Sequence, residues 1–144
     1  MVSSALNETI MHATTICHGG RGGMIIGASG SGKSGLALQL LALGAGLVAD
    51  DRTRLWQEGH EIMADVPEAI KGRIEARGVG ILAAPAMGPV PVALVIDMDK
   101  IETARLPPNR TLRILDREVP LIRKVQSPCF PAAILLYLNG GRIA

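Results

Sequence analysis

The chain of 144 residues is the size of one domain, and its formal net charge of +2 is too small to indicate a nucleic-acid or membrane-surface partner. Hydrophobic residues make up 48% of the chain and charged residues 19%, which excludes a disordered chain and favours a compact globular fold. The sequence shows neither a signal-peptide pattern nor an apolar stretch long enough to span a membrane. The expected location is therefore the cytoplasm.

The first third of the chain predicts a β-α-β unit. Residues 12–17 are rich in β-branched side chains and predict a strand, which a glycine-rich turn separates from a short apolar strand at 24–26. Apolar residues at helical spacing predict a helix over 33–43, and residues 46–49 predict the next strand. A crossover of this length predicts that strands 24–26 and 46–49 run parallel, as neighbours or nearly so.

The rest of the chain predicts further strands and a terminal helix. Residues 73–82 contain two closely spaced glycines, which are uncommon inside either a strand or a helix. The remaining expected elements are a hairpin of 53–57 and 61–66 around Gly59, a short helix at 67–72, a buried strand at 90–96, a partly alternating segment at 111–119 and a helix at 131–138.

One segment, GASGSGKS, matches the phosphate-binding pattern G-x-x-x-x-G-K-[ST] in full. It lies between an apolar strand and an amphipathic helix, which is the context that the pattern requires. Lys33 is expected to contact the β- and γ-phosphates of a nucleoside triphosphate, and the Ser34 hydroxyl to contact Mg²⁺. The predicted nucleotide-binding residues are Gly27, Ala28, Ser29, Gly30, Ser31, Gly32, Lys33 and Ser34. The predicted fold is accordingly one compact α/β domain over residues 1–144, with a P-loop-containing mixed sheet and flanking helices.

Acidic residues follow two of the predicted strands. Asp50 and Asp51 end the strand at 46–49, where open α/β sheets bind ligands beside the phosphate loop. One of two adjacent carboxylates can act as a general base, although both could instead cap a turn or pair with a nearby arginine. Asp97 ends an apolar strand and is a second candidate for the residue that contacts Mg²⁺ in an ordinary P-loop ATPase.

Four features in this order resemble the catalytic domain of bacterial HPr kinase/phosphorylase. They are His12, GASGSGKS, the VADD that ends on Asp51, and the E-x-R-G-x-G segment that starts at Glu75. The resemblance runs from about residue 6 to about residue 138. It implies an ATP- and Mg²⁺-dependent serine kinase that phosphorylates the phosphocarrier protein HPr or a related carrier. A homo-oligomer is a further expectation from this family.

The resemblance also implies roles for particular residues. Asp51 matches the catalytic base of the family, and Asp50 matches an acidic neighbour that supports metal binding. Glu75 matches a Mg²⁺-binding glutamate, and His12 matches an active-site histidine near the phosphates. Arg105 is the best match for a catalytic arginine further along the chain.

The likeness is weaker at both ends of the chain. Members of the family carry an additional N-terminal domain, so a short form is expected here. Residues 121–136 keep Arg123 and Lys124 but lack the P-x-R-P-G-R-N pattern that is associated with dephosphorylation, so phosphorylase activity is not expected with the kinase. Two alternatives stay open: a regulatory module that senses ATP or phosphate and acts through a protein partner, and a small-molecule kinase of the P-loop type.

Overall fold

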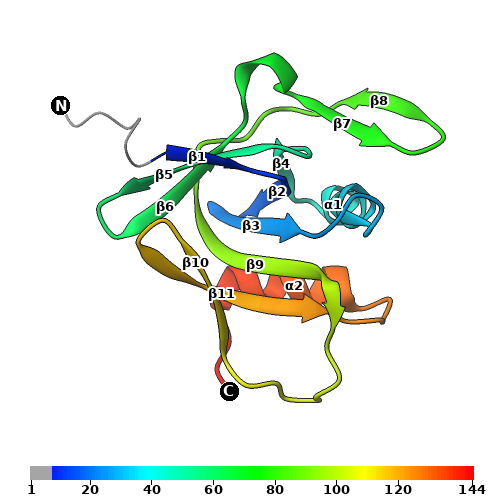
Figure 1. Ribbon diagram of the computed structural model, residues 1–144. Coiled ribbons are helices and arrows are strands. Elements are labelled where there is room, and N and C mark those ends of the chain that lie inside the picture. Colours follow the sequence, from blue (N-terminus) through cyan, green and yellow to red (C-terminus); the bar gives the residue numbers. More distant parts are fainter. Residues whose placement is uncertain (1–7) are drawn as a thin grey trace.

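The computed structural model describes residues 8–144, which form eleven named strands, two α-helices and one short 3₁₀ helix. Most of the chain is strand, and the two α-helices follow the phosphate-loop segment and the last strand (Figure 1). The elements are β1 (Glu8–Met11), β2 (Ala13–His18), β3 (Arg21–Ile26), α1 (Lys33–Ala42), β4 (Gly46–Ala49), β5 (Thr53–Glu58), β6 (Glu61–Asp65), η2 (Glu68–Ile70), β7 (Arg73–Ala76), β8 (Gly80–Ala83), β9 (Val90–Ile101), β10 (Arg110–Ile114), β11 (Arg117–Lys124) and α2 (Phe130–Gly140).

The long strand β9 organises a mixed sheet of nine strands. Along the main path the order is β1-β5-β6-β9-β3-β2-β4, and the β10–β11 hairpin joins through β11, which also pairs with β9. The first residues of β9 pair antiparallel with β6, whereas its later residues pair parallel with both β3 and β11. Strand β9 therefore curves between two parts of the sheet (Figure 1). The β7–β8 hairpin forms a separate two-stranded sheet.

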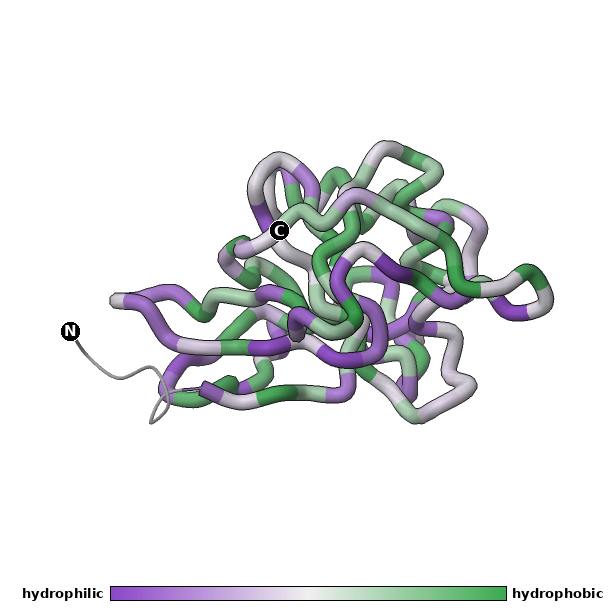
Figure 2. The backbone as a smooth tube through the Cα atoms, turned by 90° about the horizontal axis from the view of Figure 1, so that it is seen from above, coloured by the Kyte–Doolittle hydropathy of each residue, from purple (hydrophilic) through white to green (hydrophobic). Residues whose placement is uncertain are grey.

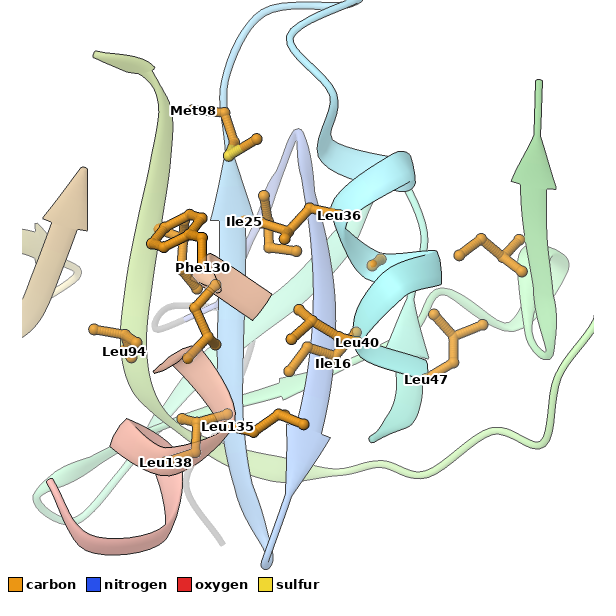
Figure 3. Close-up of a cluster of buried hydrophobic side chains, with 14 residues drawn as sticks. Ile16, Ile25, Leu36, Leu40, Leu47, Leu94, Met98, Phe130, Leu135 and Leu138 are labelled. Carbon is orange, nitrogen blue, oxygen red and sulfur yellow. The ribbon is translucent and has the colours of Figure 1, made fainter. Parts of the chain in front are cut away.

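Both faces of the central strands are covered. On one face, α1 and α2 pack against the sheet through a cluster that includes Ile16, Ile25, Leu40, Leu94 and Leu138, each at most 1% exposed (Figure 3). On the other face, residues of β5, β6, β10 and β11 close a second cluster. Figure 2 shows the hydrophobic segments gathered in the middle of the molecule. No helix within residues 8–144 has both the length and the apolar character needed to cross a membrane.

The predicted α/β fold with a mixed sheet and flanking helices is confirmed, and most of the predicted elements are present. The hairpin of β5 and β6 turns at Gly59, whose φ of 59° is readily adopted by glycine. The expected short helix after Pro67 is the 3₁₀ helix η2. The expected terminal helix is α2, and the segment at 111–119 is the β10–β11 hairpin.

The strand order differs from the simplest β-α-β arrangement. Strands β3 and β4 run parallel, but β2 lies between them and is antiparallel to both. The cause is the tight turn between β2 and β3: Gly19 and Gly20 both have positive φ, which suits a two-residue hairpin loop and places β2 directly beside β3. Helix α1 therefore crosses over β2 before the chain enters β4.

The other difference concerns residues 73–82, which form most of the β7–β8 hairpin. Gly78, with φ of 84°, and Gly80, with φ of 140°, supply the left-handed backbone that the connection between the two strands requires. The two glycines that disfavour a single long strand thus favour two short strands and a turn.

Candidate active site

The phosphate-binding loop joins β3 to α1 and depends on glycine at defined positions. Gly27, Gly30 and Gly32 have φ values of 148°, 84° and 100°, a region that other residues rarely adopt. A Cβ atom on Gly27 would also lie 2.5 Å from the Ser31 hydroxyl oxygen, which is too close for any real contact. The loop conformation therefore requires glycine for both backbone and steric reasons.

Lys33 lies inside this loop and is only 6% exposed. Its Nζ donates hydrogen bonds to the backbone carbonyl oxygens of Gly27, at 2.8 Å, and Ala28, at 3.2 Å. An ammonium group has three donors, so one remains for a phosphate oxygen. The N-cap of α1, Gly32, makes no side-chain cap bond, so the first backbone N–H groups of the helix are available to an anion.

Asp50 connects the loop to two other elements. Its Oδ1 accepts hydrogen bonds from the hydroxyls of Ser34, at 2.8 Å, and Thr14, at 3.1 Å. Its Oδ2 accepts the backbone N–H of Glu75 at 2.9 Å. Asp50 is 9% exposed, so these bonds fix its carboxylate and hold the β7–β8 hairpin beside the start of α1.

Asp51 faces the solvent side of the same site. Its φ of 68° lies in the left-handed region, and its backbone N–H donates to the Thr14 hydroxyl oxygen at 3.1 Å. Its carboxylate Oδ1 lies 2.7 Å from His12 Nε2, and the two side chains are 61% and 53% exposed. Because the Asp51 side chain is more than half exposed, its carboxylate is accessible to an incoming polar group.

A pocket of about 460 Å³ collects most of the residues that the sequence singled out. Its size is in the range of small-ligand sites. The predicted residues that line it are His12, Ser29, Gly30, Gly32, Lys33, Ser34, Asp50, Asp51 and Glu75, together with Arg77 of the same hairpin.

Two other candidate site residues, one basic and one acidic, lie outside this pocket. Arg105 is exposed on the connection between β9 and β10 and does not line this pocket, so its catalytic role stays a prediction. Asp97 lies on β9, where its Oδ1 accepts the backbone N–H of Asp99, and it does not line the pocket either. The pocket thus contains Glu75, together with Asp50 and Asp51, and not Asp97.

Comparison with known proteins agrees with this geometry. The sequence model described as "HPr Serine kinase C-terminal domain" matches residues 4–104. The chain belongs to this family.

Relatives of the family are similar over most of this chain. It is 32% identical to an HPr kinase/phosphorylase of Brevibacillus brevis, over 90% of this chain and 48% of the relative, and 31% identical to one of an Exiguobacterium species, over 79% of this chain and 41% of the relative. The chain therefore spans about half the length of the curated relatives that it matches. The structure "Hpr(Ser) kinase/phosphatase from Coxiella burnetii" superposes with a TM-score of 0.76 and 27% identity, over 91% of this chain and 94% of that one.

Two residues of the site were not found from the sequence. Thr14 is fully buried, donates to Asp50 and accepts from the Asp51 N–H, so it orients both acids. Asp99 accepts the backbone N–H of Ala28 through both carboxylate oxygens, at 3.0 and 3.1 Å. Neither could have been inferred from the sequence: Asp99 lies next to Ala28 because β3 and β9 pair in parallel with Ile26 opposite Asp97, and the sequence does not specify that pairing.

Proposed function

We propose that this protein is an ATP-dependent kinase that phosphorylates a serine of HPr or of a related phosphocarrier protein. The observation that carries the proposal is the pocket in which the phosphate-binding loop meets Asp51, Asp50 and Glu75. A loop of this kind binds triphosphates in many enzymes, whereas its combination with these three acids matches the chemistry expected of the family to which the chain belongs.

The acids and Ser34 fit a magnesium ion that arrives with the nucleotide. Within residues 8–144 no group of three or more His, Cys, Asp and Glu side chains is arranged to hold a metal by itself. Mg²⁺ is usually held by one or two carboxylates together with phosphate oxygens and water. Ser34, Asp50 and Glu75 would hold it, and the ion would neutralise charge on the phosphates.

Asp51 is the proposed general base. Its exposed carboxylate would accept the proton of the acceptor serine while the serine oxygen forms a bond to the γ-phosphorus and the bond from that phosphorus to the β-phosphate oxygen breaks. His12 would orient this carboxylate through the 2.7 Å contact. Lys33 and the start of α1 would hold the β- and γ-phosphates.

The proposed reaction is phosphate transfer from ATP to the carrier, and the proposal includes a protein partner and an assembly. The phosphocarrier is the proposed protein partner, and a homo-oligomer is the proposed assembly. Arg105 keeps its proposed role in stabilising transferred charge, which requires the exposed loop between β9 and β10 to approach the pocket when substrates bind.

The test is transfer of labelled phosphate from ATP to purified HPr in the presence of Mg²⁺. We expect label on the carrier with the wild-type protein, and its loss with Asp51→Asn, which keeps a residue that tolerates the left-handed backbone. Lys33→Met should lose transfer and triphosphate binding together. ATP binding by the wild-type protein without transfer to any carrier would reject the kinase and favour the sensing module. Transfer to a small molecule instead would favour the small-molecule kinase.

A further inference from the structure

A second cavity, of about 370 Å³, lies on the other side of the phosphate-binding loop. It is formed between the first turns of α1 and the segment that joins β11 to α2. Gly32 and Gly35 line both this cavity and the pocket that holds the acidic residues. The two cavities therefore meet at the start of α1, which is where the β-phosphate of a bound nucleotide would lie.

The lining of this cavity suits a flat, partly polar group. Its apolar part is made by Leu36, Met98 and Phe130, which are 5%, 9% and 6% exposed. Figure 3 shows these three side chains in the cluster between α1, β9 and α2, with Met98 at the end nearest the loop. Gln39 and Gln126 line the cavity from its exposed side, and each amide can both donate and accept hydrogen bonds.

The strand order fixes which end of a nucleotide points here. Asp50, Asp51 and Glu75 stand on the β4 and β7 side of the loop, so the γ-phosphate lies toward them in the proposed kinase. Strand β9 flanks β3 on the opposite side and contributes Met98 to the second cavity. A triphosphate that crosses the start of α1 therefore has its α-phosphate and nucleoside on the β9 side.

Gly35 lines both cavities. It lies within α1, where glycine is a poor helix former, and a Cβ added to it would meet no atom within 4 Å. Packing therefore does not require glycine at this position. Glycine at this position leaves the surface between the two cavities free of a side chain.

We propose that the cavity lined by Leu36, Met98 and Phe130 binds the base and ribose of the nucleoside triphosphate, with Gln39 and Gln126 as its polar contacts. This inference rests on triphosphate binding at the loop, as in the proposed function. The apolar side chains exclude water from the faces of the base, and the two amides contact its polar edge or the ribose hydroxyls.

The experiment compares the affinities of ATP and inorganic tripolyphosphate by calorimetry with Mg²⁺ present. The wild-type protein should bind ATP at least about tenfold more tightly than tripolyphosphate. The double variant Gln39→Ala, Gln126→Ala should weaken ATP binding about tenfold, which corresponds to the loss of two hydrogen bonds, and leave tripolyphosphate binding within about twofold. Gly35→Leu, which places a side chain on the surface between the two cavities, should also weaken ATP more than tripolyphosphate. Gln57→Ala, on the distant strand β5, is the matched control and should change neither affinity.

The possible failures are distinguishable. Equal wild-type affinities for ATP and tripolyphosphate, or unchanged ATP binding in the double variant, would overturn the nucleoside site while leaving the kinase proposal intact. A wild-type protein that binds neither ligand would overturn both, because the phosphate-binding loop would then not hold a triphosphate.

Discussion

The hydroxyl of Ser34 and the carboxylate of Asp50 are joined by a hydrogen bond of 2.8 Å. Ser34 lies in the first turn of α1, and Asp50 directly follows β4, which is separated from the phosphate-binding loop by the whole of α1. Because Asp50 also accepts the Glu75 N–H, one carboxylate holds together the three segments that form the pocket. Its loss should therefore affect both the stability of the fold and the site.

Asp50→Ala is expected to lower the free energy of unfolding by about 3 kcal/mol, because several hydrogen-bond donors around a nearly buried carboxylate lose their acceptor. Urea denaturation followed by circular dichroism measures this change. Asp51→Asn is the control, because the neighbouring side chain is exposed and should shift the free energy by less than about 0.5 kcal/mol. Equal stability of the two variants would show that Asp50 does not hold the segments together.

His12 and Asp51 supply a kinetic prediction. His12→Ala removes the contact that orients the proposed base and should lower kcat at least about tenfold, with little change in KM for ATP. Steady-state transfer to HPr measures both constants. His18→Ala, at the end of β2 and outside the pocket, should behave as wild type. An unchanged kcat in His12→Ala would remove His12 from the mechanism.

Asp99 is predicted to be a positioning residue for the phosphate-binding loop. Its carboxylate fixes the Ala28 N–H, and the Ala28 carbonyl oxygen accepts from Lys33, so the first turn of the loop is held from both sides. Asp99→Ala should raise KM for ATP about tenfold, with a smaller change in kcat, because the loop is less ordered before binding.

Two further variants and one structural measurement separate positioning from a general loss of stability. Asp99→Asn keeps one acceptor oxygen and should restore most of the affinity for ATP. Hydrogen exchange of the loop amides should speed up in Asp99→Ala alone. Asp116→Ala, in the distant β10–β11 turn, is the matched control. The same KM in all these variants would contradict the prediction.

The phosphate-binding loop could be predicted from the sequence because its chemistry lies in eight consecutive residues between two elements of clear periodicity. Asp50 and Asp51 were found for a similar reason, since they directly follow an apolar strand. Thr14 could not be found, because its contact with Asp50 exists only when β2 lies between β3 and β4. The two-glycine turn between β2 and β3 sets that position of β2. The crossover pattern predicts that β3 and β4 are parallel, but it does not predict that another strand lies between them.

Strand pairing also explains why Asp99, on the other side of the loop, was not predicted. The sequence predicted that the strand at 90–96 ends at Asp97, and in the structure β9 continues to Ile101. The strand continues past Asp97 through an irregularity in its pairing with β11, which resumes at Ile101, and this extension brings Asp99 to the loop. Local hydrophobicity marks the buried part of a strand and not the polar end that continues beyond the core, so the functional end of β9 was not found.

Glu102 lies at the start of the loop that carries Arg105, and it leads to a prediction about how stability depends on pH. Its side chain is 7% exposed and accepts hydrogen bonds from Arg110 and from the Ala104 backbone N–H. Burial alone would raise the pKa of Glu102, but the bonds from Ala104 and Arg110 outweigh it and hold the pKa below its ordinary value of 4.5. The bonded carboxylate therefore stabilises the fold above pH 4.5, and this contribution is lost as the pH falls through the lowered pKa.

Glu102→Gln should consequently be less stable than wild type at neutral pH, and the difference should shrink as the pH falls below 4.5. Urea denaturation at a series of pH values measures it for both proteins. Glu68→Gln makes the same chemical change at an exposed position of η2 and should follow the wild-type curve. A constant difference between wild type and Glu102→Gln across this range would mean that the carboxylate contributes no pH-dependent stability, since only a group whose pKa changes on folding can make the two curves converge.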